Sequence, residues 1–269
     1  MKLKRLAASA VIAAGIVLSG PAGAVPAGYH LVWSDEFDRG TLPSLAKWRY
    51  DTWRNKDGWW NGEAQYYSAN RPQNARIGHG QLIIEARHEK LAQYKDYGGQ
   101  AFSSARLITD GTARWTYGFF EIRARLSCTA GAWPAIWLMG DEWPKGGELD
   151  IMEQLGFDPS TVYGTAHTPD SVAHHTPSGA AAHITEPCTA FHRYQLEWTH
   201  DAVTFLIDDV PFHTYARPAN ATHETWPFDQ PEYLILNVAV GGSWAGQKGI
   251  DAPHFPASMA LDYVRVYQK

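Results

Sequence analysis

The sequence is poor in cysteine and has no repeated or strongly helical segments. Its only cysteines are Cys128 and Cys188, too few for a disulfide-dense scaffold or a cysteine-rich metal site. It contains no internal repeat, low-complexity tract or linker, which argues for one domain without an appended module. No segment keeps a helical hydrophobic period beyond two turns, so a helix bundle is excluded.

Positive charge is also scarce. The chain has 23 Lys and Arg against 28 Asp and Glu, and three of the basic residues are Lys2, Lys4 and Arg5. They precede an apolar stretch that ends in small residues up to Ala24, a pattern typical of a secretory signal. We therefore expect residues 1–24 to be removed and residues 25–269 to be secreted, into the medium or the periplasm.

Removal of this signal leaves 20 basic residues (23 minus 3) against 28 acidic ones, a formal charge of −8. That balance argues against a nucleic-acid partner and weakly against a polyanionic substrate. No later apolar run has the length of a membrane span, so we expect no membrane partner after signal cleavage. We also expect a monomer. In an exported protein, Cys128 and Cys188 are expected to form one disulfide.

Short strand-like segments separated by turns make up the rest of the chain. They lie at residues 29–37, 80–88, 104–109, 117–126, 134–140, 148–154, 161–168, 194–215, 232–242 and 260–268. Many short strands at regular spacing predict an all-β fold, either a β-sandwich or a jelly roll. Segment 194–215 is predicted to turn near His200 and Asp201 and again at Asp208 and Asp209.

Alternation of apolar and polar residues predicts which faces two of these strands bury. In the first strand, one face carries Phe120, Ile122, Ala124 and Leu126. In the second, strict alternation groups Leu261, Tyr263, Arg265 and Tyr267 against Asp262, Val264 and Val266.

The segment 148–153 places three acids in an apolar run. In a regular strand, Glu148 and Asp150 share one face and Glu153 points to the other. One extra residue, a β-bulge at Ile151-Met152, returns Glu153 to the face of the first two acids. The paired apolar residues Ile151 and Met152, where alternation calls for one, are what such a bulge looks like in sequence. We therefore predict an acid row of Glu148, Asp150 and Glu153.

Three neighbouring carboxylates repel one another, so stability alone does not explain them. One interpretation is an acidic edge facing solvent, or a calcium site, although a strand offers few of the loop carbonyls that calcium uses. The other is glycoside hydrolysis with retention, in which one carboxylate attacks the anomeric carbon and another protonates the leaving oxygen. In this interpretation Asp150 keeps the pKa values of the two glutamates apart.

Aromatic residues are abundant, with 12 Trp, 13 Tyr and 10 Phe. Many belong to the core, because large rings dominate packing. Several tryptophans instead lie beside turns, in "TWRNKDGWWNGEAQYY", "AGAWPAIWLMGDEWP" and "GGSWAG". Such residues suit flat ligands such as sugar rings, and packing at the rim of the fold is the alternative.

The segment "GGELDIMEQLG" resembles the bulged active-site signature, Glu-x-Asp-x-x-Glu, of glycoside hydrolase family sixteen. Flanking segments are similar to its bacterial laminarinase branch, over residues 29–268 in order: "VWSDEFD", "WNGEAQYY", "SARLITDGTARWTYGFFEIRARL", "AWPAIWLMG", "VYGTAH", "FHRYQLEWT", "YLILNVAVGG" and "MALDYVRVYQ". The resemblance implies a β-jelly-roll catalytic domain, a sandwich of two curved antiparallel sheets with a concave substrate cleft. It also implies endo-cleavage of β-1,3-glucan with retention.

Carried over by position, the resemblance makes Glu148 the nucleophile, Glu153 the general acid/base and Asp150 the helper. The residues expected to contact sugar are Asn61, Arg106, Trp115, Glu121, Trp133, Trp137, His167 and Asn237. Arg106 has an alternative role as a structural ion-pair partner, and Trp137 as a core residue. Catalysis needs no cofactor. The family resemblance also implies a structural Ca²⁺ held by Asp262 with the carbonyls of Glu36 and Gly80.

Two other functions share this fold. One is a glucan-binding protein without catalysis, which intact Glu148, Asp150 and Glu153 argue against. The other is an enzyme for a different polymer, either mixed-linkage β-1,3-1,4-glucan or a galactan of the agarase or carrageenase type. The acidic mature charge disfavours a sulfated galactan.

Overall fold

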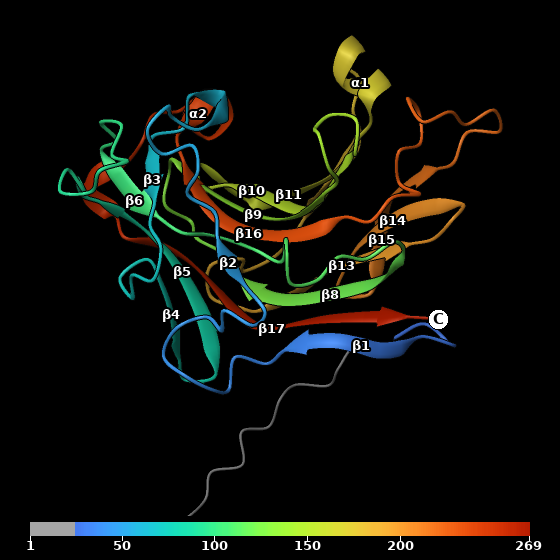
Figure 1. The fold of residues 1–269 in the computed structure, drawn as a ribbon, viewed down its shortest axis with the longest axis horizontal. Coiled ribbons are helices and arrows are strands. Elements are labelled where there is room, and N and C mark those ends of the chain that lie inside the picture. Colours follow the sequence, from blue (N-terminus) through green and yellow to red (C-terminus); the bar gives the residue numbers. More distant parts are fainter. Residues whose placement is uncertain (1–24) are drawn as a thin grey trace, which may run out of the picture.

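Two stacked, curved β-sheets make up the protein. The computed structural model describes residues 25–269, and the predicted signal at 1–24 lies outside the described residues. In Figure 1, β9, β10, β11 and β16 form an upper layer above β8, β17 and β1. The predicted all-β sandwich of two curved sheets is confirmed.

The upper sheet has seven strands in the order β12-β11-β10-β9-β16-β7-β2, and every neighbouring pair is antiparallel. Its strands are β2 (Arg49–Tyr50), β7 (Arg106–Ile108), β9 (Ala132–Met139), β10 (Glu148–Leu155), β11 (Asp158–His167), β12 (Ser178–His183) and β16 (Tyr233–Val240). Strands β9, β10 and β16 occupy its centre and supply the floor of the site described below.

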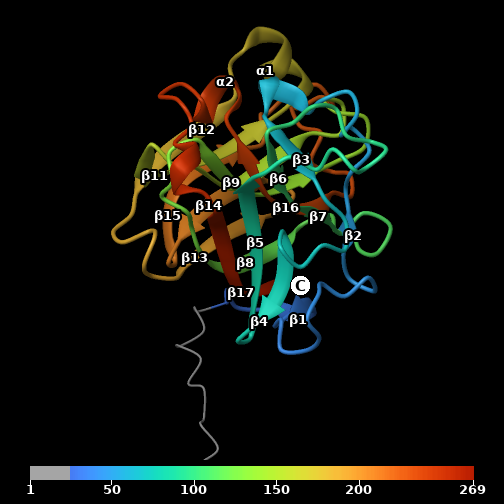
Figure 2. The same ribbon diagram turned by 90° about the vertical axis from the view of Figure 1, so that its left-hand side faces the viewer.

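The lower sheet has ten strands, with β15-β14-β13-β8-β17-β5-β6-β3 as its main path, β1 paired with β17 and β4 with β5. The strands are β1 (His30–Asp35), β3 (Gln65–Tyr67), β4 (Ala75–Gly78), β5 (Gln81–His88), β6 (Phe102–Ser104), β8 (Gly118–Arg125), β13 (His192–Trp198), β14 (Ala202–Ile207), β15 (Val210–Ala216) and β17 (Ala257–Gln268). Short helical turns connect strands: η1 (Trp60–Gly62), α1 (Pro169–His174), α2 (Gly242–Ala245) and η2 (Ala252–His254). Figure 2 looks at the side of the molecule on which β3, β5 and β6 lie. On this side β5 runs from the lower layer toward the upper one.

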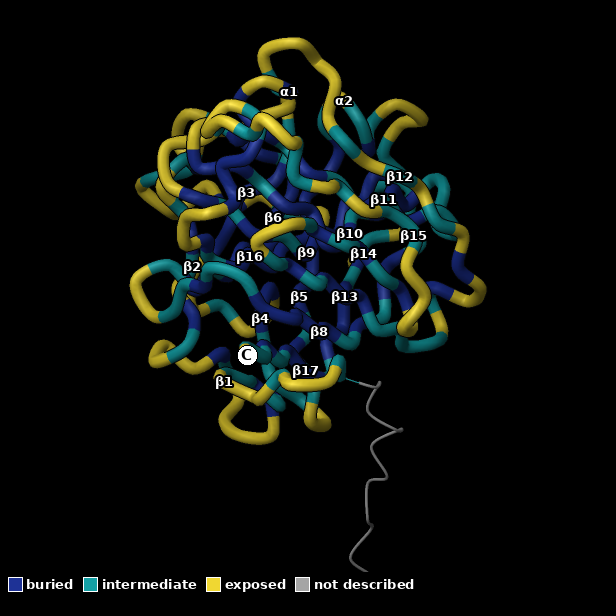
Figure 3. Tube along the Cα trace, turned by 90° about the vertical axis from the view of Figure 1, so that its right-hand side faces the viewer, coloured by how far each residue is buried: buried dark blue, intermediate teal, exposed yellow. Residues whose placement is uncertain are grey.

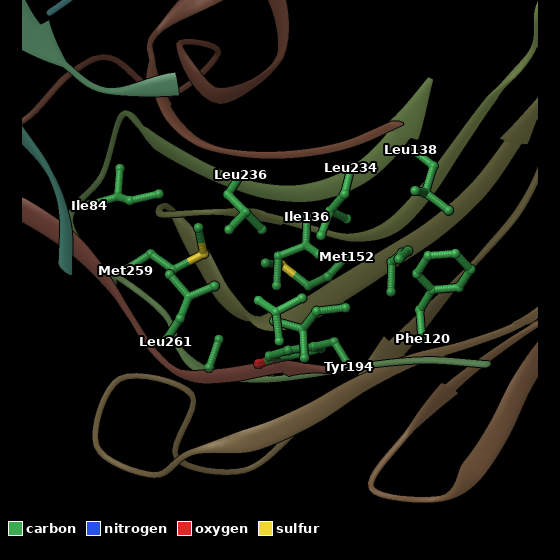
Figure 4. Close-up of a cluster of buried hydrophobic side chains, with 14 of the residues drawn as sticks. Ile84, Phe120, Ile136, Leu138, Met152, Tyr194, Leu234, Leu236, Met259 and Leu261 are labelled. Carbon is green, nitrogen blue, oxygen red and sulfur yellow. The ribbon is translucent and has the colours of Figure 1, made fainter. Parts of the chain in front are cut away.

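The core fills the space between the sheets. Figure 4 shows Ile136, Met152 and Leu236 of the upper sheet facing Tyr194, Met259 and Leu261 of the lower one. These side chains are fully buried, and Figure 3 shows that exposure is concentrated in the connecting loops. The strand faces follow the two-residue alternation, so the predicted core positions Phe120, Ile122 and Ala124 of β8 are confirmed.

The predicted turns of segment 194–215 are also present. Strands β13, β14 and β15 form consecutive antiparallel pairs that turn around His200 and at Asp208 and Asp209. The last two residues have φ values of 49° and 70°. Positive φ at both central positions is typical of the tight turn whose twist matches a hairpin, and Asp tolerates it better than most residues.

Strict alternation in residues 261–267 is wrong. The register of β17 against β8 shifts between Leu261 and Tyr263, which is a bulge at Asp262. Leu261 therefore shares the core with Val264 and Val266, whereas Tyr263 lies outside that cluster and its hydroxyl donates to Glu121. Tyr263 misled the prediction because it can be buried on either face when its hydroxyl has a partner.

The disulfide Cys128–Cys188 is present, with a Cα–Cα distance of 5.8 Å. It joins the connection after β8 to the segment before β13, where the Leu126 amide also donates to the Pro187 carbonyl. Across residues 25–269, none of the helices has the length and hydropathy that a bilayer span requires.

Candidate active site

A cleft of about 660 Å³ opens on the face of the upper sheet that is turned away from the core. Alternation in β9 explains this placement: Trp133, Ala135, Trp137 and Met139 line the cleft, and Ile136 and Leu138 between them lie in the core. The volume falls within the range of about 300–1,000 Å³ common for ligand sites. The concave surface of β9, β10 and β16 thus forms the cleft floor.

The acid row lies on this floor because β10 is bulged. Asp150 is opposite Trp137 and Glu153 is opposite Ala135, so Ile151 and Met152 together face the single residue Ile136. Leu149, Ile151 and Met152 all point into the core. Glu148, Asp150 and Glu153 all line the cleft. The predicted bulge at Ile151-Met152 is confirmed.

Two neighbouring side chains orient the acids. The ring nitrogen Nε2 of His167 lies 3.1 Å from Oδ2 of Asp150. At the other end of the row, the indole Nε1 of Trp133 donates to Oε1 of Glu153 at 3.0 Å. His167 is opposite Glu148 in the register of β11 with β10, which fixes its position beside the row.

Burial is the largest influence on the protonation of the acid row. It raises the pKa of Glu148 to about 8, and the charge of Asp150 adds to the rise while His167 opposes it. Burial also raises the pKa of Asp150 and of Glu153, and for Glu153 the charges of Asp150 and Glu148 contribute next. Three carboxylates this close cannot all ionise at neutral pH, so the row retains protons. Such a row can supply both an acid and a nucleophile.

One carboxylate oxygen each of Glu148 and Asp150 and a ring nitrogen of His167 lie within 4.8 Å of one another. Two carboxylates and an imidazole are a ligand set that a divalent cation accepts. The same atoms are the reactive groups of the acid row, so this grouping is not a separate metal centre.

Six of the eight residues predicted to contact sugar line the cleft: Asn61, Arg106, Trp133, Trp137, His167 and Asn237. Arg106 lines the cleft and also has a structural role, because its Nε donates to buried Asp51 at 2.8 Å. Its guanidinium lies over the rings of Trp137 and Trp59, 4.7 and 5.2 Å from their centroids. A cation held against two rings in this way is positioned to bind hydroxyls beside them.

A hydrogen-bonded chain fixes Trp137 in the cleft floor. Its indole Nε1 donates to Oδ1 of Asn237 at 2.7 Å, and Nδ2 of Asn237 donates to the Tyr67 hydroxyl at 3.1 Å. The ring of Trp137 therefore faces the cleft and is not a core residue.

Trp115 and Glu121 do not reach the cleft, and their predicted contacts with sugar are wrong. Trp115 is buried in the core, edge-on to Trp33 and Phe120 at centroid distances of 5.5 and 5.7 Å. Glu121 lies on β8 of the lower sheet and accepts from the Tyr263 hydroxyl at 2.8 Å and from Gln195 at 2.9 Å. Because β8 belongs to the sheet below the core, neither of its faces borders the cleft.

The cleft also contains residues that the sequence-based list left out: Trp53, Trp60, Glu63, Met139, Trp143, Ser243 and Trp244. The four tryptophans among them lie in the turn-rich segments whose tryptophans suit flat ligands. Glu63 gives no comparable signal, yet it receives hydrogen bonds from Gln65 at 2.8 Å and Asn61 at 3.3 Å. Burial raises its pKa, and these two bonds and Arg106 oppose the rise.

The family model described as "Glycosyl hydrolases family 16" matches residues 61–265. A Beta-glucanase from Rhodothermus marinus is 46% identical over 254 residues, which cover 89% of this chain and 85% of that protein.

Solved structures show the same likeness. The chain resembles SCLam, described as a non-specific endo-beta-1,3(4)-glucanase from family GH16, with a TM-score of 0.89 and 51% identity over 91% of this chain and 93% of that one. It also resembles the laminarinase from Rhodothermus marinus, with a TM-score of 0.83 and 46% identity over 89% of this chain and 97% of that one.

Proposed function

The chain belongs to glycosyl hydrolase family 16, and from that premise we propose that it is an endo-acting β-1,3-glucanase that cleaves with retention of configuration. The observation that carries the proposal is the bulge in β10, which brings Glu148, Asp150 and Glu153 onto the floor of one cleft. A glucan-binding protein would gain nothing from three buried acids that repel one another.

The mechanism has two steps. In the first, the carboxylate of Glu148 attacks the anomeric carbon, and Glu153 gives its proton to the leaving glycosidic oxygen. In the second, Glu153 accepts a proton from water, which attacks the same carbon and releases Glu148. The raised pKa of Glu153 supports its role as the acid, since it keeps the group protonated.

The first step requires ionised Glu148 beside protonated Glu153. The hydrogen bond between the carboxyls of Glu148 and Asp150 raises the pKa of Glu148 and favours ionised Asp150, so the pair holds its proton on Glu148 at rest. Attack requires that Glu148 lose this proton, and Asp150 is the neighbour that can accept it. His167, next to both, adds positive potential when it is protonated. Asp150 is a helper in this scheme because it controls where the proton of the pair resides.

The experiment is reducing-sugar release from laminarin, barley mixed-linkage glucan and agarose by the protein and by Glu148→Gln. We expect rapid release from laminarin and none by the variant, which should unfold at a similar temperature. Laminarin binding without release would mean a glucan-binding protein, and release from agarose alone would mean a galactanase.

Mixed-linkage glucan is a second candidate substrate. The similarity to SCLam, a non-specific endo-beta-1,3(4)-glucanase, supports it. We expect slower release from barley glucan than from laminarin, and equal or faster release would reverse the order of substrates.

We propose export for this chain, and the disulfide Cys128–Cys188 supports it because disulfides persist in oxidising compartments. The secreted protein should begin at Val25 when its N-terminus is sequenced. We also propose that it acts as a monomer, which light scattering at micromolar concentration tests.

We also propose a structural Ca²⁺ site at Asp262. Strand β5 pairs with β17 up to Leu261, and β1 pairs with β17 on the far side of the bulge, from Val264 onward. Glu36 and Gly80, at the ends of those strands, therefore approach the stretch of β17 that contains Asp262. One oxygen of Asp262 accepts from Arg123 at 2.6 Å, which leaves the other for an ion. We expect millimolar Ca²⁺ to raise Tm in the protein and not in Asp262→Ala.

A further inference from the structure

Two tryptophans at the cleft rim are unusually exposed. Trp53 is 65% exposed and Trp60 is 47% exposed, although both line the cleft. Their rings meet edge to face at a centroid distance of 5.5 Å. Large apolar rings left in water on the wall of a site are more often binding surface than packing, since burying them elsewhere would add stability.

Arg54 holds the two rings in one arrangement. Its guanidinium lies 4.5 Å from the ring centroid of Trp60 and 5.3 Å from that of Trp53. Its Nε donates to the carbonyl of Gly58 at 3.0 Å, which ties the cation to the same loop. Trp53, Arg54 and Trp60 form what we call the rim platform, with flat rings beside a hydrogen-bond donor.

The loop beneath the rim platform is anchored in the protein. Fully buried Asn55 donates to the Tyr67 carbonyl at 2.8 Å and to Asp96 at 3.0 Å, and accepts from the Trp59 indole at 3.0 Å. Asn55 lies between Trp53 and Trp60 in sequence. The rings are thus presented on an ordered base, so binding does not have to order the loop.

The rim platform continues the aromatic surface of the cleft floor. Arg106 lies between Trp137 and Trp59, and the ring of Trp59 is 6.1 Å from that of Trp60. Figure 1 shows the loop that carries η1 beside α2, above the edge of the upper sheet. A chain lying over Trp137 and Arg106 that extends past Trp59 therefore meets Trp60 and Trp53 next.

We propose that the rim platform binds a glucosyl residue of a long glucan chain beyond the residues held over the cleft floor. This inference rests on the proposed function and assigns a preference for long chains to Trp53, Arg54 and Trp60. The apolar face of the sugar stacks on a ring, and Arg54 donates to its hydroxyls. Short oligosaccharides occupy only the floor and do not reach the platform.

The experiment compares kcat/KM on laminarin and on laminari-oligosaccharides of increasing length. The double variant Trp53→Ala/Trp60→Ala should lose about five- to tenfold on laminarin, mainly through KM. It should match the parent on the shortest oligosaccharide that the parent cleaves. Trp53→Phe/Trp60→Phe, which keeps flat rings, should recover most of the loss, and Leu45→Ala, exposed outside the cleft, should lose nothing.

The affinity of long and short oligosaccharides for Glu148→Gln, with and without the double substitution, provides a readout independent of turnover. Only the long ones should bind more weakly. An equal loss of affinity at every oligosaccharide length, or no loss of kcat/KM on laminarin, would overturn the rim platform. The proposed function would stand in that case, because the parent would still cleave laminarin. No release from laminarin by the parent would overturn both.

Discussion

Asp150 determines how the two glutamates of the acid row titrate. It is 3% exposed, and after burial its charge is the next cause of the raised pKa of both Glu148 and Glu153. The acidic limb of a pH–rate profile reports the ionisation of Glu148, and the alkaline limb reports loss of the Glu153 proton. Both limbs therefore depend on one neighbouring charge.

Replacing Asp150 with Asn removes this charge at almost constant shape. The pKa of both glutamates falls, so both limbs of the kcat/KM profile on laminarin should move to lower pH, by about one unit. His167 lowers both pKa values, so His167→Gln should move the limbs the opposite way. Limbs that stay in place in Asp150→Asn would contradict this account.

Glu232 is a buried acid outside the cleft lining. It is fully buried, and neither carboxylate oxygen has a hydrogen-bond partner. Burial raises its pKa well above the ordinary value, and the charges of Glu148 and Asp150 add to the rise. Folded protein must therefore keep this group neutral at a pH where unfolded chains ionise it.

Because of this difference, Glu232 lowers the free energy of unfolding by an amount that grows with pH. Below the ordinary pKa of a glutamate both states are protonated and there is no cost. Above it, the free energy of unfolding falls by up to about 1.4 kcal/mol per pH unit until the raised pKa is reached. Denaturant unfolding at pH 5 to 8 should show Glu232→Gln gaining stability over the parent as pH rises. A constant difference would mean that Glu232 is ionised or paired in the folded protein.

At the scale of elements, the bulge in β10 places Glu153. Deleting Met152 leaves Ile151 opposite Ile136 and Glu153 opposite Ala135, so Glu153 stays on the cleft face of a regular strand. We expect this deletion to lower stability by about 2–5 kcal/mol through the lost buried side chain, yet to retain measurable activity.

Inserting one Ala between Ile151 and Met152 is the matched change of opposite sign. With the bulge kept, the insertion places Glu153 opposite Pro134, on the core face; with the bulge lost, it places Glu153 opposite Trp133, two positions further from Glu148. In both cases it should abolish release of sugar from laminarin. A folded deletion variant without activity, or an active insertion variant, would show that the bulge does not set the face of the acid.

At the scale of the whole molecule, the disulfide joins connections from both sheets. Cys128 and Cys188 are 60 residues apart, and the loop they close includes β9, β10, β11 and β12. We expect Cys128→Ala/Cys188→Ala to lose about 4 kcal/mol in denaturant unfolding, by the loop-entropy account. Activity at low temperature should persist, because neither residue lines the cleft. Unchanged stability on adding a reductant to the parent would contradict this.

Local signals were enough to predict the sandwich and the acid row. Alternation located most long strands, and Ile151-Met152 marked the bulge because alternation failed there. No such break marked the bulge at Asp262, since Tyr263 fits either face. Strands β3 and β6 pair in parallel over three residues each, and nothing local encodes a pairing between distant segments.

Positions of side chains across the sandwich were less predictable. Trp115 and Glu121 lie close in sequence to other residues of the family pattern, but a neighbour in sequence can belong to the opposite sheet. Trp53 and Trp60 were missed as individual residues because exposure depends on how the loop above Asn55 is anchored, a tertiary property.

The central claim, that Glu148 is the nucleophile and Glu153 the acid/base, is tested most directly by azide rescue of Glu148→Ala and Glu153→Ala. The substrate is a laminari-oligosaccharide with an activated aryl leaving group, and proton NMR gives the anomeric configuration of the glycosyl azide. Azide in the space of Glu148 should yield the α-azide, and azide acting on the glycosyl-enzyme of Glu153→Ala should yield the β-azide. The reverse assignment, or no azide product from either folded variant, would contradict the account.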